Sequence, residues 1–208
     1  MSDGVQAVGK IPVNLHNLGV DFYSMSGHKI HGSKGTGFLY AKKGVRFSPI
    51  VYGGGQENGM RSGTEYVGGQ IALATALKKA VDLFSENSSQ YETYKQIIRD
   101  SLADIIDFRE ICTENCSPAI MSLAFADIKG EVLLHMLEAY HIIVGTGSAC
   151  SSKNKQSRIA KAIGLDMRYT EGIIRISFSK YNNTQQVQKL ADSLATCVKQ
   201  LRKTMLGK

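Results

Sequence analysis

The segment "SGHKIHGSKGTGFLY" (residues 26–40) places Lys29 between two histidines and ahead of three closely spaced glycines. Backbone N–H groups beside glycine can approach a phosphate closely, because no Cβ stands in the way. The spacing is not that of a nucleoside-triphosphate P-loop, which needs Gly-Lys-Ser/Thr ahead of a helix. Three interpretations remain: a solvated turn, a phosphate-binding loop, and a lysine that binds an aldehyde cofactor. Pyridoxal phosphate carries both the phosphate and the aldehyde.

The residues around this segment predict strands, and a helix follows them. Residues 19–26 and 36–43 contain the aromatic and β-branched residues typical of strands, and the glycine-rich residues 53–64 predict a loop. From about residue 68 to 84 the apolar residues recur at helical spacing. These apolar residues are Ile71, Ala74, Leu77, Val81 and Phe84.

The second half alternates further between helices and strands. Ser89 and Glu92 have capping-box spacing and predict the start of a second helix. The apolar face expected on that helix consists of Tyr91, Tyr94, Ile98, Leu102 and Ile105. The later elements expected are a strand within 119–128, a helix at 130–140, a short strand at 141–144, a strand within 172–179 and a long helix from Thr184. The fold class predicted is α/β or α+β, with two domains, residues 1–85 and residues 86–208.

Composition narrows the class of protein. The 43% apolar and 21% charged content is that of an ordinary globular domain, and no apolar run approaches the length of a membrane span. The net charge is +7, but the 25 Lys and Arg residues are scattered, so we expect a basic surface facing an acidic partner rather than direct nucleic-acid binding. Four cysteines in a chain whose first residues lack a secretory signal predict free thiols and a cytoplasmic location.

Three motifs together resemble one family. "SGHKIHGSKGTGFLY", "YGGGQENGMRSGT" and "GTGSACSS" occur in this order and are similar to those of the NifS/IscS-type cysteine desulfurases. These enzymes are class V aminotransferase-like proteins of fold type I that use pyridoxal 5'-phosphate. The resemblance implies that residues 1–85 are a remnant of the large-domain sheet that binds the cofactor. Residues 86–208 would be a small α+β domain that carries the cysteine loop.

The resemblance also implies roles for residues near the cofactor. Lys29 would form the Schiff base and move protons on the substrate, and Ser26 and His28 would bind the phosphate. Asp3 would pair with the pyridinium nitrogen, which keeps that nitrogen protonated. Gln6 would contact the phenolic oxygen.

Thr64 matches a threonine that reaches the phosphate of the neighbouring subunit, so the resemblance also implies a homodimer. This residue ends the "MRSGT" sequence within the predicted loop.

Cys150 and Arg175 are the candidates for substrate chemistry. A free cysteine is most often a buried small residue, but Cys150 stands in a serine- and glycine-rich segment followed by basic residues that would favour a thiolate. The resemblance implies that Cys150 attacks the sulfur of L-cysteine, which leaves alanine and an enzyme persulfide. Arg175 lies on the polar side of its strand and could pair with an acidic group of the protein. The resemblance makes it the residue that clamps the substrate carboxylate.

The other three cysteines are not expected to take part in catalysis. Cys112 and Cys116 are four residues apart, as in some metal sites, but no second ligand pair with zinc-site spacing accompanies them, so no metal is predicted. Cys197 lies on the apolar stripe of the last helix and is expected in the core.

The function implied is that of a cysteine desulfurase whose sulfur passes to an iron–sulfur scaffold protein or a tRNA-thiolation enzyme. The resemblance covers only the C-terminal half of the family's chain, so the 208-residue chain alone is expected to be inactive. One alternative is a non-catalytic fragment or scaffold module. Another is a different class V enzyme such as a selenocysteine lyase or an aminotransferase, although Cys150 argues against an aminotransferase.

Overall fold

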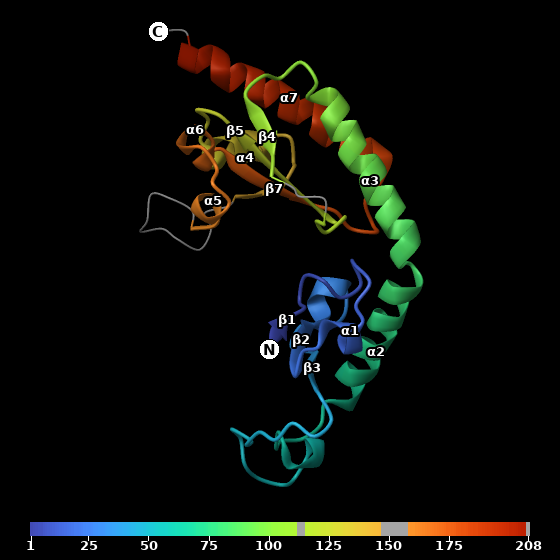
Figure 1. The fold of residues 1–208 in the computed structure, drawn as a ribbon. Coiled ribbons are helices and arrows are strands. Elements are labelled where there is room, and N and C mark those ends of the chain that lie inside the picture. The colour runs from blue at the N-terminus through green and yellow to red at the C-terminus, as the bar shows by residue number, and fades with distance from the viewer. Residues whose placement is uncertain (112–114, 147–157, 207–208) are drawn as a thin grey trace. The chain divides into compact units, whose positions relative to one another are not determined.

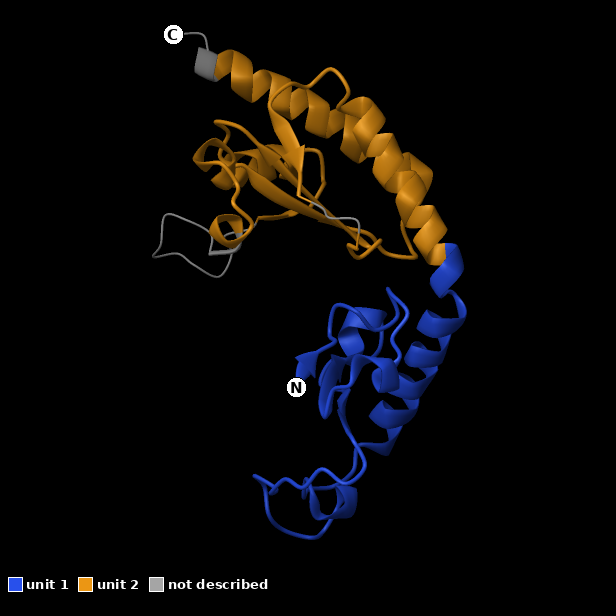
Figure 2. Cartoon of the chain, in the orientation of Figure 1, with its two compact units in different colours: residues 1–86 blue, residues 87–208 orange. Residues whose placement is uncertain are grey.

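The computed structural model describes residues 1–111, 115–146 and 158–206 (Figure 1). The chain divides into two compact units, residues 1–86 and residues 87–208 (Figure 2). Within the described ranges, no helix is both long enough and apolar enough to cross a membrane. The predicted mixture of helices and strands is observed in both units.

Unit 1 is built on a three-stranded sheet of order β1-β2-β3. Its elements are β1 (Ser2–Asp3), α1 (Leu15–Leu18), β2 (Phe22–Ser26), the 3-10 turn η1 (Gly27–Ile30), β3 (Gly37–Ala41), the 3-10 turn η2 (Glu57–Gly59) and α2 (Val67–Asp82). β1 is parallel to β2, and β3 is antiparallel to it. The two strands predicted on either side of Lys29 and the helix that follows are therefore confirmed.

The core of unit 1 is small, and the face of α2 that packs against it differs from the apolar face predicted from the sequence. Ile71 and Val81 were expected on the apolar side of the helix, but they are 63% and 60% exposed. Leu73 is buried instead, and the small residues Ala76 and Ala80 pack beside it. Small side chains let a helix approach a sheet closely, so the buried face follows them rather than the largest apolar residues.

Unit 2 is built on a four-stranded antiparallel sheet of order β4-β5-β7-β6. Its elements are α3 (Phe84–Ser101), which begins at the end of unit 1, then β4 (Phe108–Glu110), β5 (Ile120–Phe125), α4 (Gly130–Glu138), β6 (Gly145–Thr146), α5 (Arg158–Ala162), α6 (Met167–Thr170), β7 (Ile173–Ser177) and α7 (Thr184–Leu206). The helix predicted from Thr184 and the strands within 119–128 and 172–179 are confirmed.

Two boundaries predicted in unit 2 are wrong. α3 begins at Phe84, so Ser89 and Glu92 lie inside the helix and do not cap it. No glycine or proline separates Leu83 from Ser89, and nothing stops the helix from extending toward its N-terminus. The strand expected at 141–144 is observed at β6 instead, because strand pairing with β7 starts only at Gly145.

The two faces of the unit 2 sheet are covered differently. Helices α3, α4 and α7 cover one face with a large core (Figure 1). This core includes Tyr94, Ile98, Met121, Leu123, Phe125, Leu133, Leu137, Ile174 and Leu194 among its fully buried members. The other face holds a smaller cluster, formed by Ala124, Ala126, Ala160, Tyr169 and Ile173. Because Ala160 and Tyr169 belong to α5 and α6, these short helices cover only the Ile173 end of that face.

Candidate functional site

The most concentrated set of candidate residues lies at the carboxyl ends of β1 and β2. Ser2 pairs with Tyr23 and Asp3 with Ser24, so the two parallel strands end at the same edge of the sheet. Ser26 is the last residue of β2, and His28 and Lys29 follow in η1. In open α/β sheets, ligands bind outside the carboxyl ends of parallel strands. We call Asp3, Ser26, His28 and Lys29 the carboxyl-edge cluster.

Backbone hydrogen bonds close the segment around Lys29 into a defined turn. The Gly32 amide donates to the Gly27 carbonyl at 2.9 Å, and the Gly27 amide donates to the Thr36 carbonyl at 2.8 Å. The Thr36 hydroxyl donates to the Ser33 carbonyl at 2.7 Å. β3 follows this turn, so Lys29 does not lead into a helix and the segment is not a P-loop.

Gly27 lets this turn pack tightly against its surroundings. A Cβ at Gly27 would lie 2.5 Å from the Thr36 hydroxyl oxygen and 2.9 Å from a methyl carbon of Leu73 in α2. Contacts this short would push the turn away from the helix. Thr36 was not predicted to matter, although it lies in the opening motif, because its partners become visible only once the chain is folded.

The charged residue of β1 has a local partner and a buried neighbour. The Val5 amide donates to the Asp3 carboxylate at 2.8 Å, and the carboxylate is exposed. Burial, and to a smaller degree the Asp3 charge, raise the pKa of Tyr23, so this phenol stays protonated at neutral pH. Gln6 accepts a hydrogen bond from the Lys10 ammonium at 2.7 Å, so its amide oxygen already has a partner.

The three polar side chains after β2 are available to a ligand. His28 and Lys29 are exposed, Ser26 is half-buried, and no residue in the described part of the chain forms a hydrogen bond or ion pair with these side chains. A hydroxyl, an imidazole and an ammonium at the same sheet edge as the Asp3 carboxylate fit a ligand that carries a phosphate, an aldehyde and a basic ring nitrogen. Pyridoxal phosphate has all three groups.

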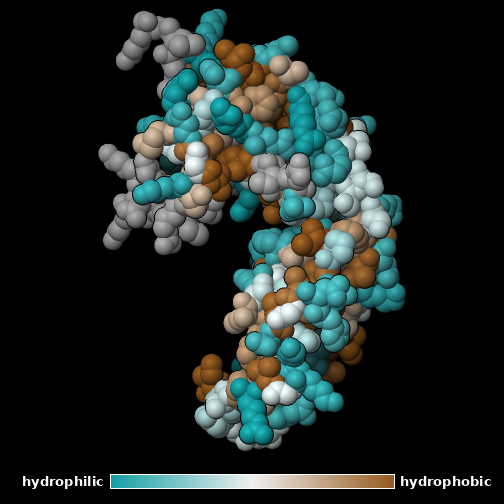
Figure 3. All heavy atoms as spheres, viewed as in Figure 1, coloured by the Kyte–Doolittle hydropathy of each residue, from teal (hydrophilic) through white to brown (hydrophobic). Residues whose placement is uncertain are grey.

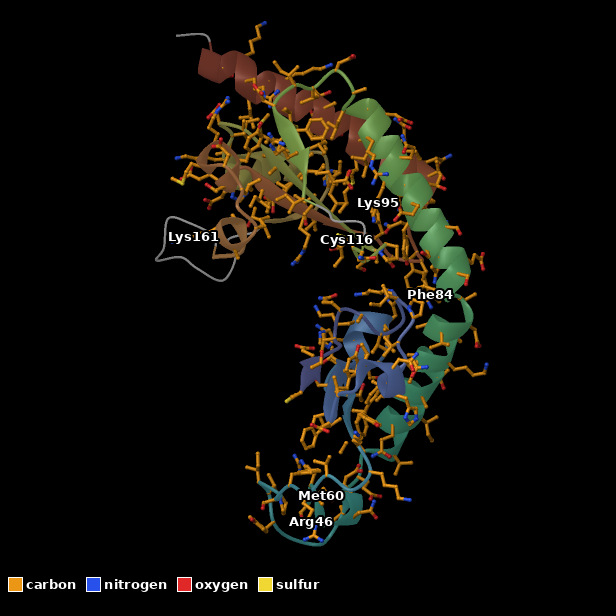
Figure 4. All side chains as sticks on the ribbon, viewed as in Figure 1. Arg46, Met60, Phe84, Lys95, Cys116 and Lys161 are labelled. Carbon is orange, nitrogen blue, oxygen red and sulfur yellow. The ribbon has the colours of Figure 1, made fainter. Side chains whose placement is uncertain are left out.

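Thr64 lies in the exposed segment that leads from β3 into α2, the segment that contains Arg46 and Met60 (Figure 4). Among the residues whose structure is described, no hydrogen bond links Thr64 to the carboxyl-edge cluster. The segment exposes apolar side chains, with Ile50 94% and Tyr52 77% exposed, and apolar atoms reach the visible surface in both units (Figure 3).

Arg175 occupies the centre of β7, directly opposite Ser122 of β5 on one side and Gly145 of β6 on the other. It is exposed and lies on the sheet face that α5 and α6 cover only in part. The guanidinium lies beside Gly145, since a Cβ on that residue would be 3.2 Å from Nη2. No acceptor in residues 1–111, 115–146 or 158–206 bonds to this guanidinium, which leaves its donors open to a ligand carboxylate.

The structure describes two of the four cysteines, Cys116 and Cys197. Cys150 and Cys112 lie outside the described residues. Cys116 is half-buried in the loop before β5, near the buried Lys95, whose ammonium donates to the neighbouring Ser117 carbonyl at 3.3 Å (Figure 4). Cys197 is fully buried in α7, and burial raises the pKa of its thiol. The prediction that Cys197 belongs to the core is confirmed.

Comparison with known proteins identifies the family. Residues 1–190 match the family model "Aminotransferase class-V". A cysteine desulfurase of Gluconacetobacter diazotrophicus is 36% identical over 204 residues, which are 97% of this chain and 51% of the relative. A putative cysteine desulfurase, IscS 1, of Bacillus subtilis is 37% identical, with 96% of this chain and 54% of the relative covered. The chain thus spans about half the length of the curated relatives it matches.

Solved structures agree in fold. A NifS-like protein superposes with a TM-score of 0.83 at 36% identity, covering 96% of this chain and 51% of that one. The cysteine desulfurase CsdA of Escherichia coli superposes with a TM-score of 0.76 at 25% identity, covering 95% and 51%. These matches confirm the predicted fold type I, over half of that fold. The chain therefore belongs to the class V aminotransferase family and is homologous to its cysteine desulfurases.

Proposed function

We propose that this chain is the C-terminal half of a pyridoxal-phosphate-dependent cysteine desulfurase, with unit 1 in the cofactor-binding domain and unit 2 as the small domain. The observation that carries the proposal is the carboxyl-edge cluster, where Lys29 is exposed beside Ser26 and His28 and has no hydrogen-bond or ion-pair partner among the described residues. Bound pyridoxal phosphate would supply an electron sink for bond cleavage at the amino acid. Lys29 would anchor it and move protons, and Ser26 and His28 would hold its phosphate.

Asp3 and Gln6 would complete the contacts to the ring. The Asp3 carboxylate would hold a proton on the ring nitrogen, since an anion beside a basic nitrogen favours its charged form. Gln6 would contact the phenolic oxygen through its amide NH2 group, because its amide oxygen already accepts from Lys10. Thr64 would reach the phosphate of a neighbouring subunit, so the working form proposed is a homodimer.

The sulfur would pass from L-cysteine to Cys150. The Cys150 thiolate would attack the substrate sulfur, and the carbon–sulfur bond would break with its electron pair left on the substrate carbon. Protonation of that carbon would give alanine, and the sulfur would remain on Cys150 as a persulfide. An iron–sulfur scaffold protein or a tRNA-thiolation enzyme would then accept the sulfur. A cytoplasmic location fits these partners. A selenocysteine lyase is the second candidate among enzymes. Turnover rates measured side by side with L-cysteine and with L-selenocysteine would separate the two, because a lyase would prefer L-selenocysteine.

Replacing Arg175 with alanine should weaken the binding of cysteine. The guanidinium has no hydrogen-bond partner in the described part of the chain, and in the proposed function its donors would bind the substrate carboxylate. Losing such a charge-assisted pair costs on the order of 2–5 kcal/mol. In a protein that carries both halves of the fold, we expect a large rise in KM for L-cysteine. Arg175→Lys should recover part of the affinity, and an unchanged KM in Arg175→Ala would remove Arg175 from this role.

The 208-residue polypeptide alone should release no sulfide above background. It spans about half the length of its relatives, and the carboxyl-edge cluster supplies contacts from one part of the fold only. The test incubates the purified polypeptide with pyridoxal phosphate, L-cysteine and a reductant, and measures alanine and sulfide. Equal amounts of both products, dependent on Lys29, would show that half of the fold is sufficient. A polypeptide that also formed no borohydride-reducible adduct with pyridoxal phosphate would favour the alternative of a non-catalytic module.

A further inference from the structure

Gly145 lies where an added side chain would press on the Arg175 guanidinium. A Cβ built on Gly145 would be 3.2 Å from Nη2, 3.5 Å from Nε and 3.6 Å from Cζ of Arg175. These three distances place the guanidinium directly beside Gly145, on the sheet face that carries Arg175. The Arg175 side chain therefore leans over the edge strand β6.

The backbone at Gly145 does not itself require glycine. The glycines with positive φ in the described residues do not include Gly145, so its backbone conformation is open to other residues. It is paired in register with Arg175, as any strand residue could be. The close approach of the guanidinium is the feature that an added side chain would disturb.

Among the described residues around Arg175, Gly145 is the one that contacts the guanidinium on the β6 side. α5 and α6 cover the face only near Ala124 and Ile173, one row away from Arg175. The residue directly opposite Arg175 on the other side is Ser122, which is also small. Among the described residues, none forms a hydrogen bond or ion pair with the guanidinium, and Gly145 is the neighbour that an added side chain would bring against it.

We propose that Gly145 is a positioning residue for Arg175: the missing side chain lets the guanidinium lean over β6, where it would meet the substrate carboxylate. The proposal rests on the proposed function, in which Arg175 binds that carboxylate. An alanine at position 145 would push the guanidinium by a few tenths of an ångström, and a valine would push it further. Misplacement of a binding group weakens recognition without changing the fold.

The first test follows the guanidinium directly in the 208-residue protein labelled with 15N-arginine. The Nε–Hε signal of Arg175 is identified by its absence in Arg175→Lys. We expect this signal to shift in Gly145→Ala and to shift further in Gly145→Val. Gly68→Ala is the matched control, because a Cβ there meets nothing within 4 Å. An unmoved signal in both Gly145 variants would overturn the proposal.

The second test measures kinetics in the complete protein. We expect KM for L-cysteine to rise about threefold in Gly145→Ala and about tenfold in Gly145→Val, with kcat nearly unchanged. In the Arg175→Ala background, the same substitutions should have no further effect, because Gly145 acts through the guanidinium. A rise in KM that persists without Arg175 would assign Gly145 a merely structural role.

The two proposals fail in different ways. If Arg175→Ala raises KM but neither Gly145 variant does, the carboxylate clamp stands and the positioning role is wrong. If Arg175→Ala leaves KM unchanged while the Nε–Hε signal still shifts in the Gly145 variants, the packing is as described but the proposed role of Arg175 is wrong. The positioning role would then be wrong with it.

Discussion

In Lys29→Ala, pyridoxal phosphate should no longer attach covalently to the protein. Among the lysines that the structure describes, only Lys29 lies at the carboxyl end of β2, in η1 beside Ser26 and His28. An alanine provides neither the amine that bonds to the aldehyde nor the base that moves protons. Loss of a positioned base alone costs about 10²–10⁴-fold in rate, so turnover in the complete protein should fall at least that far.

Borohydride reduction followed by intact-mass measurement detects the adduct in the 208-residue protein or in the complete one. Lys34→Ala is the matched control, because Lys34 is an exposed lysine in the same segment. We expect the Lys34 variant to retain the adduct wherever the unsubstituted protein forms it. A normal adduct in Lys29→Ala that disappears in Lys34→Ala would transfer the role to Lys34.

In Cys150→Ser, persulfide formation should stop while pyridoxal phosphate and cysteine still bind. A serine hydroxyl keeps the size of the side chain but is a far poorer nucleophile toward sulfur, because it is not ionised at neutral pH. In the complete protein, sulfide release in the presence of a reductant should fall to background. The mass gain of one sulfur atom, which marks the persulfide, should be absent.

Cys116→Ser and Cys112→Ser are the controls for this experiment. Cys116 is half-buried in the loop before β5, and both residues lie apart in sequence from the serine-rich segment around Cys150. We expect both variants to keep the persulfide mass. Loss of the persulfide in Cys112→Ser with full activity in Cys150→Ser would identify a different thiol as the nucleophile.

The sequence predicted those features whose signals are local. The strands beside Lys29 were predictable because aromatic and β-branched residues lie on both sides of a glycine-rich turn, and both strands are observed. Arg175 was expected on the polar side of its strand, and it is exposed beside the equally exposed Ser177. The capping pattern of Ser89 was misleading, since a local cap signal does not start a helix when the preceding residues can be helical as well.

Other features depend on contacts between distant residues. β6 has only two residues, and its position follows from its pairing with Arg175 and Ile174, which lie some thirty residues later in the chain. The contacts of Thr36 with Gly27 and of Gly145 with Arg175 likewise arise only after the strands have paired. No residue pattern at positions 27, 36 or 145 could have predicted them. The roles assigned to the site residues remain predictions until the substitutions above are made.

The separation of the buried cores predicts how the chain exchanges its amide hydrogens with solvent. Unit 1 has a core of five buried residues, Val8, Tyr23, Met25, Ile30 and Leu73, and every member of the two other clusters belongs to unit 2. Because no described core residue is shared, each unit opens as its own cooperative segment. The amides of β2 and β3 should therefore exchange well before those of β5 and β7. Any ligand that binds at Lys29 should slow the exchange of unit 1 and leave that of unit 2 unchanged.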